Sequence, residues 1–171
     1  MKKFYALCIS FVMLISCISL PVSAAETGAE TGSVGVSVFY QEWSDSTPVF
    51  DKNEMYGLAT SDDVHDLSDS NMTIYWTLPG EGSLQSGLCK TNTTIICVGF
   101  DLNRDASVKV ELLDSSGNSL AETTLTYYIA DGRTPTVKFT NLTSSKNYRV
   151  KITNNSQNQV IVVGSVRDSV F

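Results

Sequence analysis

The chain has 171 residues, with 12 basic and 18 acidic side chains and a formal net charge of −6. This length is sufficient for one domain with a buried core. An acidic protein repels a phosphate backbone, so nucleic acid is excluded as an expected partner. The chain has only one histidine, so zinc sites built from cysteine and histidine are not expected either.

Residues 1–24 are predicted to be a secretory signal peptide. Lys2 and Lys3 precede the uncharged apolar run FYALCISFVMLISCISL, and the small-residue pattern VSAA follows it. Cleavage there makes the protein secreted or extracellular, and the short basic start is typical of bacteria. The alternative is that MLISC, which ends at Cys17, directs lipidation and gives a membrane-tethered lipoprotein. Contact with a membrane is expected only in that case.

After the signal, residues 25–33 are predicted to be a flexible leader, of which residues 25–32 are two copies of the motif AETG. The predicted domain covers residues 34–171 and begins with alternating apolar residues that indicate a strand, Val34, Val36, Val38 and Tyr40. Residues 44–70 show no period and are rich in acids, so they are interpreted as an acidic loop. A short helix over DDVHDL, with Ser61 as its cap, is compatible with this segment.

The rest of the chain has the period of two that is typical of strands. MTIYWTL, TTIICVGFDL and SVKVELL are followed by SLAETTLTYYI, TVKFTNL, YRVKIT and VIVVGSV, with turns at PGEGS and DSSGN. About eight or nine short strands with no long amphipathic helix predict an all-β fold, a single antiparallel β-sandwich.

Two stretches of the second half resemble known domains. FTNLTSSKNYRVKIT, in which Leu142 precedes Tyr148, resembles the E–F corner of fibronectin type III and related immunoglobulin-like domains. VKVELLDSSGNSLAE resembles a hairpin of bacterial extracellular immunoglobulin-like modules. The resemblance covers about residues 93–166 and implies a sandwich in which the Tyr148 hydroxyl bonds back to the chain near the corner. It implies no active-site residues, because such modules share none.

Two cysteines, Cys89 and Cys97, lie after the predicted signal. An even number of cysteines in an oxidising compartment predicts a disulfide between them, within a hairpin or between adjacent strands. The alternative is a pair of reduced, buried thiols.

The sequence contains two groups of candidate metal ligands. The denser group can offer hard oxygens to calcium, the one candidate cofactor, and consists of Asp62, Asp63, Asp66 and Asp69. The alternative is a solvated acidic loop. In DLNRDAS, the residues Asp101, Asn103 and Asp105 have calcium-loop spacing, but the glycine and glutamate of an EF-hand are missing. We therefore interpret DLNRDAS as a turn between two strands.

Aromatic side chains are the candidate ligand-binding residues, namely Trp43, Tyr56 and Tyr128. Trp43 lies at the mouth of the acidic loop. Tyr127 and Tyr128 must point to opposite faces of a strand, so one of them lies nearer to solvent. Exposed aromatic rings suit sugars and protein surfaces, whereas the alternative is that these rings fill the core.

These patterns favour a secreted or surface-associated, non-catalytic binding or adhesion module of a bacterium. Its expected partner is an extracellular protein or a glycan. A carbohydrate-binding module supported by calcium is the alternative. A small secreted hydrolase that uses His65 or paired carboxylates is a further alternative. It is less favoured, because no recognised nucleophile motif occurs in the sequence.

Overall fold

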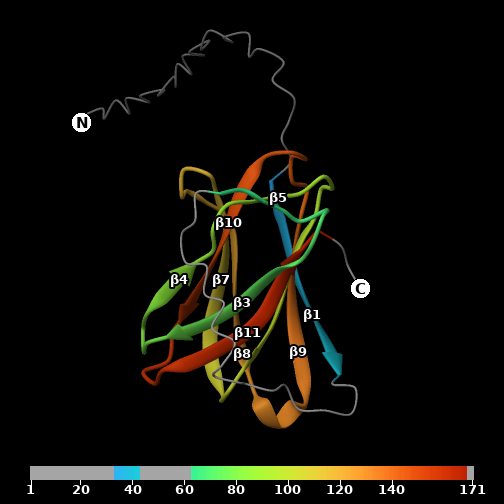
Figure 1. Ribbon diagram of the computed structural model, residues 1–171. Helices are drawn as coiled ribbons and strands as arrows, with labels where there is room; N and C mark the ends of the chain where they lie inside the picture. The colour runs from blue at the N-terminus through green and yellow to red at the C-terminus, as the bar shows by residue number, and fades with distance from the viewer. Residues whose placement is uncertain (1–32, 43–62, 169–171) are drawn as a thin grey trace, which may run out of the picture. The chain divides into compact units, whose positions relative to one another are not determined.

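Two sheets pack face to face in the computed structural model, which describes residues 33–42 and 63–168 (Figure 1). The predicted all-β sandwich is therefore confirmed. In the described part of the chain the only helical element is η1, a 3₁₀ turn at Ile129–Asp131, and no helix there is long and apolar enough to cross a membrane. The predicted signal peptide lies outside the described residues.

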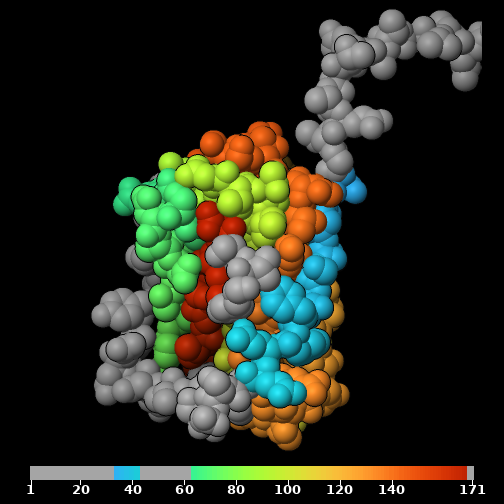
Figure 2. Space-filling model, turned by 90° about the vertical axis from the view of Figure 1, so that its right-hand side faces the viewer, coloured from blue at the N-terminus to red at the C-terminus, as the bar shows by residue number. Residues whose placement is uncertain are grey.

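The first sheet has five strands in the order β1-β9-β6-β11-β3, and all its ladders are antiparallel. Figure 2 shows β3, β11 and β1 in turn across one face of the molecule. The strands are β1 (Gly35–Glu42), β3 (Met72–Leu78), β6 (Ile96–Leu102), β9 (Arg133–Thr140) and β11 (Val160–Arg167).

The second sheet has the order β2-β5-β10-β7-β8, and β4 also pairs with β10. Its long strands are β7 (Ala106–Asp114), β8 (Ser119–Tyr127) and β10 (Asn147–Asn154). Its short strands are β2 (His65–Asp66), β4 (Ser83–Gln85) and β5 (Cys89–Lys90). The short strands were not predicted, because two or three residues are too few to show a period of two. The short helix that the sequence allowed over DDVHDL is wrong, because His65 and Asp66 form a strand that pairs in parallel with β5.

The core lies between the sheets and follows the predicted alternation. In β3 the buried side chains are Met72, Ile74, Trp76 and Leu78. The middle strand β6 is buried on both faces, which explains why its sequence is a continuous apolar run. Phe100 of β6 and Phe139 of β9 are the largest fully buried side chains.

The Tyr148 side chain packs at the place where the chain crosses from β9 in the first sheet to β10 in the second. Its hydroxyl donates to the Thr143 carbonyl oxygen and accepts from the Thr143 N–H, both at 3.0 Å. The bond back to the chain that the resemblance implies is therefore present. Because the Tyr148 ring is only 4% exposed, one side chain both fills the core and satisfies the backbone of the crossing.

We expect Tyr148→Phe to destabilise the fold by about 1–2 kcal/mol, because two hydrogen bonds are lost while the ring stays buried. Urea unfolding followed by fluorescence measures this change. Tyr128→Phe is the matched control, since the half-exposed Tyr128 should change stability by less than about 0.5 kcal/mol. Equal stability of Tyr148→Phe and the parent would contradict the assigned role.

The predicted disulfide between Cys89 and Cys97 is wrong, because both residues are free, buried thiols. Cys89 of β5 belongs to the core, where its thiol donates to the Tyr148 carbonyl oxygen at 3.5 Å. Cys97 lies on β6, between two residues that face the core, so it points out of the sandwich beside its register partners Lys138 and Arg167. The first sheet therefore separates the two sulfur atoms.

Burial raises the pKa of the Cys89 thiol to about 12, which keeps it protonated and unreactive at neutral pH. We expect Ellman's reagent to leave the native protein without its predicted signal peptide, residues 1–24, unmodified at pH 8. In concentrated guanidinium chloride without reductant, both thiols should react. An unfolded chain that shows no reactive thiol would mean that the disulfide forms after all.

Candidate binding site

A cleft of about 230 Å³ opens at the end of the sandwich where the chain passes from β8 through η1 to β9. In Figure 1 the end of β1 lies at the same end of the molecule as η1. The cleft is lined by Tyr40, Thr126, Tyr127, Tyr128, Asp131 and Arg133. We call this feature the tyrosine cleft.

Two tyrosines present their rings to solvent at the tyrosine cleft. Tyr40 and Tyr128 are each 52% exposed, whereas Tyr127 is 2% exposed and belongs to the core. The expectation that consecutive tyrosines point to opposite sides is thus confirmed. Tyr40 is in alternation with Val38 of β1 and with Val34 just before the strand, both of which pack against the core, but it lies nearer the open end of the strand.

The DLNRDAS segment holds the cleft in place. Asp105 accepts a hydrogen bond at 2.8 Å from the N–H of Ile129, the first residue of η1. Asp101 accepts hydrogen bonds from the Thr134 hydroxyl at 2.8 and 3.0 Å, and from the Tyr127 hydroxyl at 3.4 Å. Burial and the nearby Asp101 raise the pKa of Tyr127, so its hydroxyl keeps the proton that it donates. These two carboxylates therefore tie β8, η1 and β9 together.

The third polar residue of this segment ties it to a different strand. Asn103 donates its N–H to the Ile161 carbonyl oxygen at 3.2 Å, and its side-chain oxygen accepts the Ile161 N–H at 2.8 Å. The predicted turn between two strands is confirmed, since the segment joins β6 to β7. Its side chains, however, bind distant strands rather than the local backbone.

Charged groups flank the two exposed rings. Arg133 forms an ion pair with Glu42 at 3.7 Å, and both side chains are exposed, so the pair contributes little stability. Asp131 is exposed on η1, whose last turn is closed by Gly132 with a φ of 61°. The tyrosine cleft thus offers two aromatic faces, a carboxylate acceptor and guanidinium donors.

No protein-family model and no curated protein matches the chain.

Of the predicted ligand-binding residues, the structure places Tyr128 in this cleft. Trp43 and Tyr56 lie outside the described residues. Tyr40, Asp131 and Arg133 were not among the predicted site residues. For Tyr40 the available signal was its place at the end of a strand whose earlier core-facing positions are all valine.

The acidic loop does not present its described carboxylates as one cluster. In the described part of the chain, no group of three or more histidine, cysteine, aspartate or glutamate side chains is placed to hold a metal ion. Asp63 and Asp69 are exposed, Asp66 is on β2, and Asp62 lies outside the described residues. The calcium site stays a prediction.

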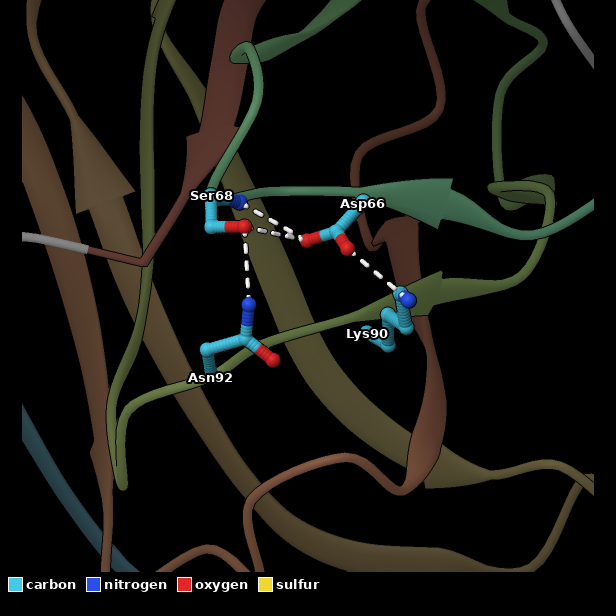
Figure 3. A network of polar contacts seen from close by, with 4 residues as sticks. All are labelled: Asp66, Ser68, Lys90 and Asn92. Atoms are coloured by element: carbon cyan, nitrogen blue, oxygen red, sulfur yellow. Dashed lines mark hydrogen bonds and ion pairs between the residues drawn. The ribbon is translucent and has the colours of Figure 1, made fainter.

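Asp66 is engaged in a polar network that joins β2 to β5 (Figure 3). The Lys90 ammonium lies 2.8 Å from its Oδ2. Its Oδ1 accepts from the Ser68 hydroxyl at 2.7 Å and from the Ser68 N–H at 3.1 Å. The Asn92 amide donates in turn to the Ser68 hydroxyl at 2.8 Å. Lys90 and Ser68 lower the pKa of Asp66 to about 2, so a lysine supplies the neutralising charge.

His65, the candidate for hydrolase chemistry, lies in the same turn. Its Nε2 is 2.8 Å from the Ser70 carbonyl oxygen and 3.3 Å from the Ser70 hydroxyl. The carbonyl contact uses the ring nitrogen as a donor and ties β2 to the end of the turn that leads into β3. This placement gives the ring a structural role, and the hydrolase stays a prediction.

The Asp66 network predicts a distinct response to acid. Because its folded pKa is lowered to about 2, the carboxylate stabilises the fold above its ordinary pKa of about 3.9. That stability is lost as the pH falls from there through about 2. Carboxyl NMR titration should find a midpoint near 2 in the parent, raised most by Lys90→Met and less by Ser68→Ala. An ordinary midpoint in the parent would refute the network.

Proposed function

We propose that the chain is an exported, non-catalytic binding module of a bacterium, secreted or held at the cell surface, and that its ligand is a carbohydrate. The observation that carries the proposal is the tyrosine cleft, in which two half-exposed rings lie beside Asp131 and Arg133. The apolar face of a sugar ring packs on an aromatic side chain. Its hydroxyl groups accept from guanidinium and donate to carboxylate groups.

The dimensions and charge of the cleft narrow the ligand class. Its volume of about 230 Å³ is smaller than the roughly 300–1,000 Å³ of pockets that enclose a drug-sized molecule. It therefore suits one sugar ring, such as a terminal residue. The net charge of −6 disfavours polyanionic glycans, which leaves neutral sugars as the better match.

Binding is better supported than hydrolysis at this cleft. Glycoside hydrolysis ordinarily needs two carboxyl groups on either side of the bond that is cleaved. Among the described residues that line the cleft, Asp131 is the only carboxylate. Glu42 lies nearby, but it is paired with Arg133.

A glycan array tests this proposal with the exported chain. We expect binding to neutral glycans that weakens about tenfold in Tyr128→Ala and in Tyr40→Ala, because each change removes one stacking face. Tyr128→Trp should retain binding, since a ring is preserved. Val64→Ala is the control, because Val64 is also exposed, at 41%, and does not line the cleft.

The same array separates the alternatives. Binding that survives EDTA is expected from the tyrosine cleft, whereas loss of binding in EDTA would support the calcium-dependent alternative. An array with no bound glycan in either condition would end the carbohydrate proposal. Unchanged binding by both alanine variants would place the site elsewhere.

A further inference from the structure

A second cavity lies at the other end of β1, where β9 crosses to β10. Its volume is about 750 Å³, which is within the range of ligand pockets. It is bordered by the start of β1, the turn between β7 and β8, and the loop 141–148. It shares no lining residue with the tyrosine cleft. We call it the corner cavity.

The turn between β7 and β8 is a rigid wall of the corner cavity. Asp114 accepts hydrogen bonds from the Ser116 N–H at 2.8 Å and from the Asn118 N–H at 2.9 Å, and its other oxygen accepts from the Asn118 amide at 2.9 Å. The Asn118 bonds lower the pKa of Asp114, so it stays ionised. Gly117 closes the turn with a φ of 89°, which favours glycine.

The opposite wall, the loop 141–148, is held just as firmly. The Ser145 N–H donates to the Thr91 carbonyl oxygen at 2.8 Å, and the Leu142 N–H donates to the Thr94 carbonyl oxygen at 3.1 Å. Asn141 and Ser145 have positive φ angles of 60° and 63°. Such backbone costs free energy and persists only where the surroundings impose it. The cavity is therefore formed before any ligand arrives.

The lining has an apolar floor and a polar rim. Val34, Leu142 and Tyr148 form the floor, and Leu120 adds an apolar edge that is 40% exposed. The rim carries hydroxyl and amide groups. Tyr148, the only aromatic residue among the described residues of the lining, is 4% exposed, so it offers no stacking face to a sugar. This combination suits an apolar side chain attached to a polar backbone.

Two strand edges lie next to the corner cavity. Within residues 33–42 and 63–168, β1 pairs only with β9, and β8 pairs only with β7. Each leaves a row of backbone N–H and C=O groups without a ladder partner. Among the described residues nothing pairs with this edge of β1, whose eight residues pair with β9 without a bulge, contain no proline and carry one charge, Glu42 at the far end. Val36, 39% exposed, continues the apolar surface along it.

We propose that the corner cavity and the adjoining edge of β1 bind an extended peptide segment of a partner protein. The segment adds to β1 as a strand and places one apolar side chain in the cavity. It carries little net charge, because Asp114 and Lys146 are the charged lining residues and their charges cancel. This proposal is independent of the carbohydrate proposal, which uses the other end of β1.

A second copy of the chain is a poorer occupant of the β1 edge. If two β1 strands paired antiparallel about their centres, Gly35 of one copy would face Glu42 of the other. Glu42 would then approach the corner cavity, whose floor is apolar. Placing a charged side chain against an apolar floor costs free energy, which disfavours that pairing.

Selection from a phage library of random short peptides on the exported chain tests the proposal. We expect the enriched sequences to alternate apolar and polar residues. A synthetic peptide of this kind should shift the amide NMR signals of residues 34–36 and 141–148. Leu120→Lys should weaken binding of the peptide at least tenfold, and Val36→Lys should weaken peptide binding as well. Val64→Lys is the matched control, being an equally exposed valine that lies outside both sites.

The outcomes distinguish a peptide of a partner protein from a second copy of the chain. They also distinguish peptide binding at the corner cavity from glycan binding at the tyrosine cleft. Unfolding midpoints of the lysine variants establish that each is folded. Tyr128→Ala should bind the peptide as the parent does. No enriched peptide, or equal binding by Leu120→Lys, overturns the proposal. A dimer in light scattering that Leu120→Lys dissociates would assign the edge to a second copy and overturn it too.

Discussion

Each sheet buries one face against the other, so the chain must leave the ladders wherever it crosses between sheets. The backbone groups released there need new hydrogen-bond partners. The crossings at the two ends of β9 find them in side chains. At one end Asp105 accepts from the first N–H of η1, and Asp101 beside it accepts from the Thr134 hydroxyl. At the other end the Tyr148 hydroxyl binds both backbone groups of Thr143.

Both candidate sites lie at these crossings, and the hydrogen bonds that satisfy the backbone there also hold the walls of the two sites. The tyrosine cleft is held by Asp101 and Asp105, and the corner cavity by Tyr148 and the bonded loop around Ser145. A wall with satisfied hydrogen bonds does not need to order itself when a ligand binds, which lowers the entropic cost of binding. The two sites differ in chemistry because only one of them exposes aromatic rings.

The sequence predicted what depends on neighbours along the chain. Alternation located the long strands, and it predicted that Tyr127 and Tyr128 point to opposite sides; the structure buries Tyr127 and exposes Tyr128. It did not predict which groups meet across the fold. Cys89 and Cys97 are close in sequence, yet the first sheet separates them. The aspartates of the acidic loop suggested calcium, but the charge beside Asp66 belongs to Lys90 on a different strand.

The edge strand β1 connects the two sites. Val34 precedes it at the corner cavity, and Tyr40 lies near its end at the tyrosine cleft, six residues further on. At about 3.3 Å per residue these positions are about 20 Å apart. A short strand paired with the first half of β1 therefore leaves the cleft open, whereas a peptide that pairs along the whole strand reaches Tyr40. The length of the paired segment thus decides whether the two proposed ligands, a peptide and a sugar, can be bound at the same time.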